Sequence, residues 1–308
     1  MIVAAPVLPL DALRAAFGER LREDQALARY TSARIGGKAD ALLNVRSAAE
    51  LAEAARTLWD LELPFIVLGG GSNMLVSEAG VHEVVILNQA SQVRFDEGET
   101  PSVWAESGAG FGSIARQAAA KGLSGLEWAA GIPGTLGGAV VGNAGAHGGD
   151  LSQVLEVAEI LHHTEGKQDR SPADLAYEYR NSWLKGQVAE AVVLGARLKL
   201  SRKPAKEIRA QMDTFVAYRR LTQPPGASMG SMFKNPPGES AGRLIEAAGL
   251  KGKRIGNAQI SPLHANFFLN LGDARAADVK ALIDAARQAV REQSGVELEL
   301  EIGLVGEW

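Results

Sequence analysis

The chain has 308 residues, of which 46% are hydrophobic and 22% are charged, and its formal net charge is −4. This composition is typical of a globular protein with about two domains, and the negative charge removes a general electrostatic reason to bind nucleic acid. The sequence contains no cysteine, which excludes disulfides and thiol chemistry and fits a reducing, cytoplasmic location.

The first residues of the chain are apolar, but the apolar stretch is short. Residues 1–10 contain two prolines and no basic residue, and they lead into a helix-like sequence at residues 11–17. We therefore expect neither an export signal nor a membrane span, and no membrane partner. Residues 1–24 are interpreted as an N-terminal extension with one helix.

A βαβ-like run at residues 25–90 is predicted to form the first subdomain. Ser47 and Glu50 form a capping box that opens a helix over residues 51–58. A strand, a glycine turn and a second strand follow within residues 65–76. The turn has three glycines followed by Ser72 and Asn73, so its backbone donors are available for a phosphate.

A second, longer glycine loop dominates residues 91–202, the predicted second subdomain. Eight of the nineteen residues from 131 to 149 are glycine, mixed with apolar residues. Such a loop lets a backbone approach a ligand without a Cβ, although a cluster of tight turns between strands is the alternative. Short strands are expected near residues 84–87, 103–105, 154–157 and 191–194, with a helix over 113–121.

Two phosphate-binding loops suggest a dinucleotide. The chain lacks the Gly-x-x-x-x-Gly-Lys-Ser/Thr pattern, so a P-loop nucleoside triphosphatase is not expected. Gly108, Gly110 and Gly112 approach a Rossmann fingerprint, but Ser113 stands where the third glycine belongs. A nicotinamide Rossmann fold is therefore the weaker alternative.

Residues 203–308 are predicted to form a substrate domain. Helices are expected at 205–220, 241–248 and 276–292, followed by an alternating strand at 296–305. The alternation places Glu297, Glu299 and Glu301 on one face, where solvent exposure is the favoured interpretation for the first two. The segment 230–236 is either a solvated turn or the wall of a site. No metal site is expected, since His162 and His163 have no further ligand at suitable spacing.

Eight motifs together resemble one family. In chain order they are Arg34-Ile-Gly-Gly37, Gly69-Gly-Gly-Ser-Asn73, Gly131-Ile-Pro-Gly-Thr-Leu-Gly-Gly138, Asn143-Ala-Gly145, Tyr179-Arg-Asn-Ser182, Gly230-Ser-Met-Phe-Lys-Asn-Pro236, His264-Ala-Asn266 and Leu298-Glu-Leu-Glu-Ile302. Their order and spacing are similar to those of the UDP-N-acetylenolpyruvoylglucosamine reductase (MurB) family. The resemblance extends from about Thr31 to Gly306.

The resemblance implies an α+β protein with an FAD-binding fold of the vanillyl-alcohol-oxidase (PCMH) type. Two subdomains, 25–90 and 91–202, would hold the flavin, and an α+β domain at 203–308 would bind the substrate. The implied reaction uses NADPH to reduce UDP-N-acetylglucosamine enolpyruvate to UDP-N-acetylmuramate for peptidoglycan synthesis. With no cysteine in the chain and His147 as the one histidine near the loops, we expect the FAD to be noncovalent.

The same resemblance assigns the site residues. Arg180 would stabilise the developing enolate, Ser231 would deliver the proton to carbon, and Glu301 would also be catalytic. The predicted FAD-binding residues are Gly69, Gly70, Gly71, Ser72, Asn73, Gly131, Pro133, Gly134, Gly138, Asn143 and Gly145. The predicted substrate-binding residues are Arg219, Arg220, Lys234 and Asn235. For the arginine pair, an ordinary basic helix end stays open.

Two other functions stay open. One is an FAD oxidase of the same fold, and the other is a flavin-binding or UDP-sugar-binding protein without turnover. The interval from Arg180 to Ser231 is too short for the extra tyrosine loop of the longer family form, so we expect the shorter form. The expected partners are a UDP-sugar and NADPH, and nothing in the sequence indicates an oligomeric state.

Overall fold

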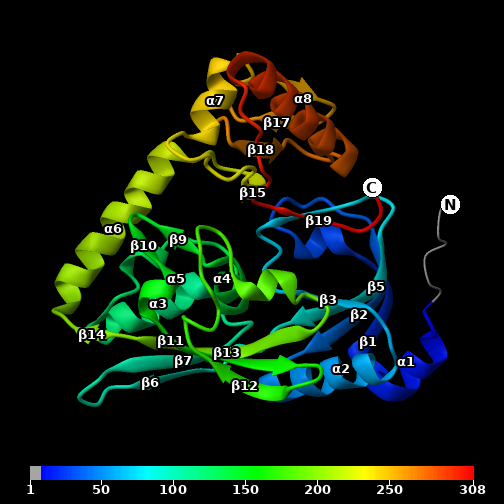
Figure 1. The fold of residues 1–308 in the computed structure, drawn as a ribbon, viewed down its shortest axis with the longest axis vertical. Coiled ribbons are helices and arrows are strands. Elements are labelled where there is room, and N and C mark those ends of the chain that lie inside the picture. Colours follow the sequence, from blue (N-terminus) through cyan, green and yellow to red (C-terminus); the bar gives the residue numbers. More distant parts are fainter. Residues whose placement is uncertain (1–7) are drawn as a thin grey trace.

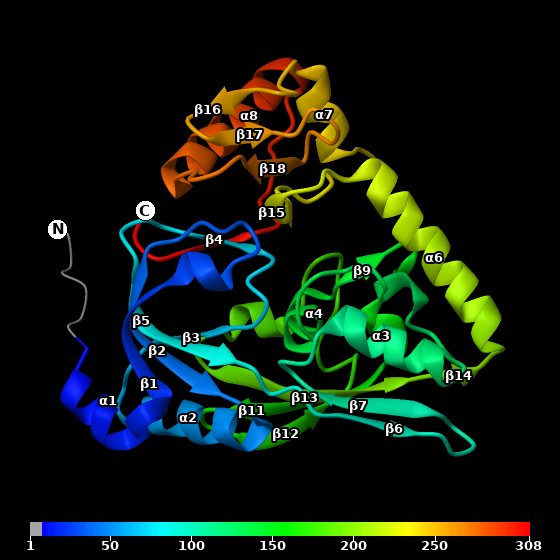
Figure 2. The same cartoon turned by 180° about the vertical axis from the view of Figure 1, so that it is seen from behind.

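The computed structural model describes residues 8–308, which contain three main sheets (Figures 1 and 2). The first has the order β1-β2-β5-β3, formed by β1 (Leu21–Ala26), β2 (Lys38–Val45), β5 (Val81–Asn88) and β3 (Phe65–Leu68). The strands β2, β5 and β3 are parallel, while β1 is antiparallel to β2. The helices α1 (Leu10–Phe17) and α2 (Ala48–Asp60) contribute to the core of this sheet. The predicted βαβ arrangement is therefore confirmed.

The predicted capping box before α2 forms only in part. The Ser47 hydroxyl accepts a hydrogen bond from the Glu50 amide at 3.1 Å, and the Glu50 carboxylate accepts one from the Arg46 amide. Only the Ser47 contact satisfies a donor of the helix start, because the Glu50 carboxylate bonds the Arg46 amide and not the Ser47 amide. The helix α2 begins three residues before its predicted start, because Ala48 directly follows the cap, and it ends two residues past its predicted end.

The second sheet is antiparallel throughout, with the order β12-β11-β13-β7-β6. Its strands are β6 (Val93–Asp96), β7 (Ser102–Glu106), β11 (Leu155–His162), β12 (Gly166–Arg170) and β13 (Ala191–Lys199). The helices α3 (Phe111–Ala120), α4 (Leu136–Gly142) and α5 (Leu151–Val154) contribute residues to its core. The Rossmann alternative is wrong, because β7 lies between two antiparallel neighbours.

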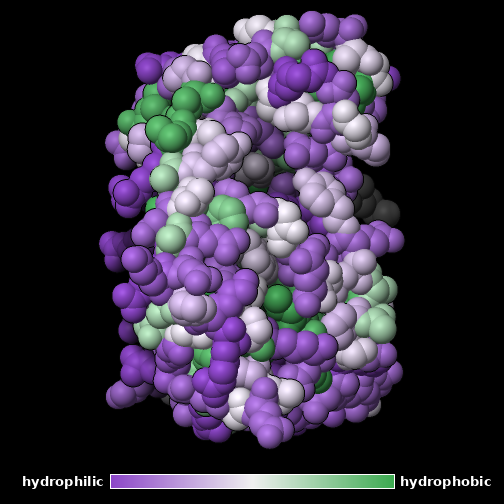
Figure 3. Space-filling model, turned by 90° about the vertical axis from the view of Figure 1, so that its left-hand side faces the viewer, coloured by the Kyte–Doolittle hydropathy of each residue, from purple (hydrophilic) through white to green (hydrophobic). Residues whose placement is uncertain are grey.

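The third sheet, antiparallel with the order β15-β18-β17-β16, lies above the other two (Figure 1). It is formed by β15 (Ala227–Ser231), β16 (Arg254–Ile255), β17 (Ala258–Ile260) and β18 (Phe267–Asn270) and carries α7 (Ala241–Ala247) and α8 (Ala276–Ser294). The long helix α6 (Ala205–Thr222) runs along the side of the molecule to reach it (Figures 1 and 2). The face along α6 is mainly hydrophilic, with hydrophobic residues in small groups (Figure 3).

The chain end returns to the first part of the molecule. The strand β19 (Gly303–Val305) pairs in parallel with β4 (Met74–Val76), the strand that follows the first glycine turn. The predicted strand over residues 296–305 is therefore wrong for 296–302, where a single bridge joins Leu300 to Phe233. Apolar and polar residues alternate in this segment because Leu298 and Ile302 are buried. Among residues 8–308, no strand pairs with the segment over its full length.

Two polar contacts fasten the third sheet and α8 to the first part of the chain. The Asn270 amide donates to the Ala33 carbonyl at 2.9 Å. The Glu78 carboxylate accepts from the backbone amides of Ala276 and Ala277 at the start of α8. A carboxylate is favourable there because the helix dipole is positive at its N-terminus.

Short elements complete the description of residues 8–308. They are β8 (Leu123–Ser124), β9 (Gly145–Ala146), β10 (Gly149–Asp150), β14 (Ser201–Arg202) and the 3-10 helices Gly18–Arg20, Leu27–Tyr30, Glu127–Ala129 and Trp183–Gly186. No helix in this part of the chain is both long enough and apolar enough to cross a membrane.

One surface pair predicts a pH dependence of stability. His82 Nδ1 lies 2.8 Å from the Asp40 carboxylate, and this hydrogen bond raises the pKa of His82 above its usual value. A raised folded-state pKa stabilises the protein below the unfolded pKa and loses that contribution as pH rises through the folded value. We expect His82→Gln to lower the free energy of unfolding near pH 6 by less than about 1 kcal/mol, because both groups are partly exposed.

The difference between the two proteins should shrink as pH rises through the folded-state pKa of His82, because the histidine is then neutral in both states. Urea unfolding of both proteins across this range measures it. A difference that is constant with pH would mean that the His82 ring stabilises by packing alone.

Candidate active site

The two glycine loops contact one another. A Cβ on Gly70 would lie 3.0 Å from the Gly134 Cα, and one on Gly134 would lie 2.7 Å from the Ser72 hydroxyl. A Cβ on Gly69 would lie 2.5 Å from the Thr135 hydroxyl. Only glycine permits this approach, so the loops form one continuous backbone surface.

That surface fits a phosphate-bearing cofactor. Within residues 8–308, the amides of Gly70, Gly71 and Ser72 donate to no protein acceptor. Gly71 has a φ of +56° and packs on the Tyr30 carbonyl, where a Cβ would lie only 2.1 Å away. Backbone amides in such a turn are suited to phosphate oxygens.

Arg180 is held on a loop that covers the end of α4. The hydroxyls of Tyr177 and Ser182 donate to the Val140 and Val141 carbonyls at 2.9 and 2.6 Å. These carbonyls lie in the last turn of α4, where helices leave acceptors unsatisfied. The loop is thus fixed on both sides of Arg180.

The Arg180 side chain joins three predicted motifs. Its Nε donates to a Glu301 carboxylate oxygen at 2.7 Å, and its Nη2 donates to the Gly145 carbonyl at 2.9 Å. Both side chains of the ion pair are largely buried, with 24% and 17% of their surfaces exposed. Nη1 has no partner among the described residues, so one edge of the guanidinium is available to a ligand.

Glu301 is fixed by its backbone as well. The side-chain amide of Asn73 donates to the backbone carbonyl of Glu301 at 3.1 Å. The backbone carbonyl of Asn73 accepts from the Gly303 amide at 3.0 Å. The Glu301 amide donates to the Met232 carbonyl at 2.9 Å. The first glycine turn, the chain end and the segment around Ser231 therefore meet at Glu301.

Ser231 follows an irregularity in β15. The pairing with β18 shifts between Ser228 and Ser231, and Gly230 has a φ of +78°. Bulges of this kind redirect side chains and occur beside active sites. The Ser231 hydroxyl is half-buried and has no hydrogen-bond partner in the described part of the chain.

Asn266 holds the segment after Ser231. Its side chain accepts from the Phe233 amide at 2.9 Å and donates to the Phe233 carbonyl at 2.8 Å. Within the His264-Ala-Asn266 motif, this side-chain amide is therefore the group that holds the segment. His264 accepts from the Asn266 backbone amide at 3.2 Å, and burial lowers the pKa of His264.

Replacing Asn266 should therefore destabilise the protein strongly. Asn266→Ala would leave the buried amide and carbonyl of Phe233 without partners, which we expect to cost about 2–4 kcal/mol. Urea unfolding measures this loss. Asn266→Asp keeps the acceptor, but it buries a carboxylate beside the Phe233 carbonyl oxygen, so its loss should be at least as large. A loss below about 1 kcal/mol in either variant would contradict this role of Asn266.

Of the predicted substrate residues, Lys234 lies with the group around Glu301. Its ammonium pairs with the Glu299 carboxylate, and its backbone amide donates to the Glu299 carbonyl at 2.9 Å. The Asn235 side-chain carbonyl instead accepts from the Ala241 amide at the start of α7. Glu297 and Glu299 are exposed, as their place in the sequence suggested.

The two predicted substrate-binding arginines, Arg219 and Arg220, lie in different surroundings. A Cβ on Gly131 would lie 2.8 Å from the Arg219 Cδ, so the Arg219 side chain packs on the second glycine loop. Burial lowers the pKa of Arg219, and its guanidinium makes no ion pair within residues 8–308. Arg220 is exposed. His147, near the same loop, stacks on Phe215 of α6 with ring centroids 4.3 Å apart.

Two residues predicted to bind FAD have structural contacts of their own. The Asn143 side chain donates to the Glu178 carbonyl and accepts from the Ser152 amide, both at 3.1 Å. A Cβ on Gly145 would lie 2.8 Å from the Gly149 carbonyl oxygen. Pro133 is exposed and lies before α4, and Gly138 lies in the first turn of α4. Contact of these four residues with FAD stays a prediction.

Sequence reasoning missed Lys185. Its ammonium donates to the Arg180 carbonyl at 2.6 Å from a half-buried position. The signal was present, since Lys185 is a cation five residues after Arg180 in the segment that interleaves aromatic and basic residues.

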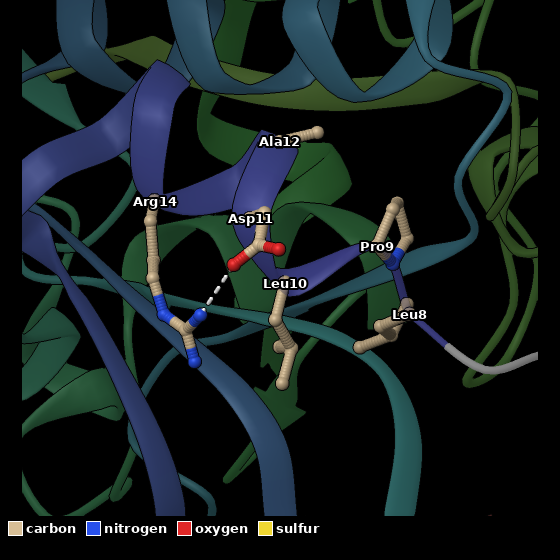
Figure 4. A pocket seen from close by; sticks show the side chains of 6 residues that line it. All are labelled: Leu8, Pro9, Leu10, Asp11, Ala12 and Arg14. Carbon is tan, nitrogen blue, oxygen red and sulfur yellow. Dashed lines mark hydrogen bonds and ion pairs between the residues drawn. The ribbon is translucent and has the colours of Figure 1, made fainter.

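A shallow hollow lies away from this site, beside α1 (Figure 4). It is lined by residues 8–12 and Arg14, and Arg14 pairs with Asp11 at 2.6 Å. None of the predicted site residues lines it.

Comparison with known proteins identifies the family. Residues 39–167 match the model of an FAD binding domain, and residues 221–305 match that of the UDP-N-acetylenolpyruvoylglucosamine reductase C-terminal domain. The reductase of Chloroflexus aggregans is 44% identical over 289 residues, covering 92% of this chain and 97% of that protein. The chain belongs to the UDP-N-acetylenolpyruvoylglucosamine reductase family.

Other members of this reductase family agree. The reductase of Rubrobacter xylanophilus is 43% identical over 285 residues, covering 92% of this chain and 95% of its own. The crystal structure of the reductase (MurB) from Thermus caldophilus aligns with a TM-score of 0.79 at 40% identity, covering 93% of this chain and all of that one.

Family membership confirms several predictions. The protein is an FAD-dependent oxidoreductase with an α+β FAD-binding fold and a C-terminal domain. Arg180 pairs with Glu301, and the Glu301 amide donates to the carbonyl of Met232, the residue after Ser231. The catalytic roles of Arg180, Ser231 and Glu301 stay predictions.

Proposed function

We propose that this protein uses NADPH to reduce UDP-N-acetylglucosamine enolpyruvate to UDP-N-acetylmuramate, a step of peptidoglycan synthesis, in the cytoplasm. The observation that carries the proposal is the ion pair between Arg180 and Glu301, which lies where the first glycine turn meets the Ser231 segment. An oxidase or a binding protein has no need of this combination.

The FAD would lie on the two glycine loops, held without a covalent bond. The amides of Gly70, Gly71 and Ser72 would face its phosphates. The Arg219 guanidinium, which makes no ion pair within residues 8–308 and lies beside Gly131, would supply a positive charge to a phosphate of the cofactor or the substrate. When bound, the flavin supplies a hydride to the methylene carbon of the enolpyruvyl group.

Arg180 would bind the substrate carboxylate. As the methylene carbon gains hydride, negative charge develops on the carboxyl-bearing carbon and its carboxylate. The guanidinium is already fixed by Glu301 and by the Gly145 carbonyl, so it needs no reorganisation when this charge appears. Glu301 thus orients the cation and limits its motion.

Ser231 would complete the reduction by giving its hydroxyl proton to the carboxyl-bearing carbon. A serine hydroxyl is a weak acid at neutral pH, so the resulting alkoxide needs positive charge nearby and rapid reprotonation. Lys234, three residues along the chain from Ser231, and Arg180 would supply that charge. Lys234 and Asn235 would also contact the UDP-sugar.

Product analysis tests this function directly. The protein is incubated without oxygen with NADPH and the enolpyruvyl substrate, and the nucleotide products are separated and weighed by mass spectrometry. We expect a product heavier than the substrate by two hydrogen atoms, together with stoichiometric oxidation of NADPH. Peroxide formed in air with the substrate left unchanged would instead favour the oxidase alternative.

A further inference from the structure

Lys185 makes a bond that links it to the reaction centre. It lies in the 3-10 helix Trp183–Gly186, and its ammonium reaches back to the Arg180 carbonyl at 2.6 Å. No other side chain of residues 8–308 donates to that carbonyl. This hydrogen bond joins two residues five positions apart and so restrains the loop that carries Arg180.

The Arg180 backbone needs such support. Its φ of +56° lies in the left-handed region, which residues with a Cβ rarely adopt. A backbone of this kind persists only when the surrounding structure holds it, and it is characteristic of functional sites. Tyr177 and Ser182 fix the flanks of the loop, whereas Lys185 binds the strained residue itself.

The charged groups around Lys185 indicate that it does more than stabilise the loop. The half-buried ammonium lies close enough to Lys234, Arg180, Glu301 and Glu299 to feel their charges. Burial lowers the pKa of Lys185, and Lys234 lowers it further. Lys185, Lys234 and Arg180 carry three positive charges, and Glu299 and Glu301 carry two negative charges. The net positive charge is unfavourable in a partly buried cluster unless an anion binds there.

We propose that Lys185 is a positioning residue for the substrate carboxylate: it holds the left-handed backbone of Arg180 so that the guanidinium faces that carboxylate. This inference rests on the proposed function, because the anion in question is the carboxylate of the enolpyruvyl or lactyl group. Lys185 itself acts through Arg180 and has no assigned contact with the reacting atoms.

The test compares two ligands that differ in that carboxylate. UDP-N-acetylmuramate carries it and UDP-N-acetylglucosamine does not, and calorimetry measures the Kd of each with the FAD-loaded enzyme. In Lys185→Met we expect about a tenfold or greater loss of affinity for UDP-N-acetylmuramate, since a charge-assisted hydrogen bond is removed, with an unchanged Kd for UDP-N-acetylglucosamine. Lys185→Arg, which restores a charged donor, should recover most of the loss.

Equal weakening of both ligands, or no weakening of either, would overturn the inference. Lys121→Met is the matched control, because that lysine forms an exposed ion pair with Glu97 at 2.7 Å in the same part of the chain, away from the site. If Lys185→Met does not fold, Lys185→Gln replaces it in the same assay. We then expect a smaller loss of UDP-N-acetylmuramate affinity. An unchanged affinity would count against the inference. Failure of the wild-type protein to bind either ligand would instead reject the proposed function.

Discussion

Replacing Ser231 with alanine should stop turnover while leaving flavin reduction intact. The Ser231 hydroxyl is the proposed proton donor to the substrate carbon, and loss of a general acid typically lowers kcat about 10²–10⁴-fold. The hydride donor NADPH does not need that proton. We therefore expect the rate of flavin bleaching by NADPH to stay within about twofold of the wild-type rate.

Stopped-flow absorbance separates the two half-reactions, with Ser228→Ala as the control. Ser228 is half-buried in the same strand, but it lies on the other side of the irregularity that Gly230 introduces. A control variant with full activity would show that loss of a hydroxyl from β15 is not harmful in itself. Turnover of Ser231→Ala at the wild-type rate would mean that the proton comes from another group.

Replacing Arg180 with methionine should produce the second large effect. The variant loses the cation that would stabilise the developing enolate, and comparable losses of a preorganised donor lower kcat about 10²–10³-fold. It also leaves the largely buried Glu301 carboxylate without its partner, so a lower free energy of unfolding should accompany the kinetic change.

Arg180→Lys distinguishes charge from geometry. Lysine keeps the positive charge but cannot bond Glu301 and Gly145 while presenting a further donor edge to the substrate. We expect its rate of flavin reoxidation by the enolpyruvyl substrate to be only slightly better than that of Arg180→Met. Arg94→Met is the matched control, because Arg94 and Arg180 each lie 5.3 Å from an aromatic ring centroid, of Trp104 and Tyr179 respectively. Full activity in Arg180→Met would remove this residue from the mechanism.

The glycine loops show what the sequence could predict. A dense cluster such as residues 131–149 has few uses other than close backbone approach, and the contacts of Gly70 and Gly134 are of that kind. The Ser47 N-cap before α2 and the long helices α6 and α8 were also predictable, because each depends on local pattern.

The contacts made across long distances in the chain were not predictable in the same way. The pairing of β19 with β4 joins residues more than two hundred positions apart, and alternation in residues 296–302 carries no information on whether a partner strand is present. The amide of Asn73 could equally have faced a cofactor or the Glu301 carbonyl. Lys185 escaped notice because its role is a single bond to a backbone carbonyl, which residue type alone does not reveal.

The measurement that tests the central claim most directly is the visible flavin spectrum of the purified protein without oxygen. It is recorded after one equivalent of NADPH and again after addition of UDP-N-acetylglucosamine enolpyruvate. We predict bleaching by the first reagent and recovery of the oxidised spectrum with the second. Recovery only when air is admitted would contradict the proposed reaction and favour the oxidase.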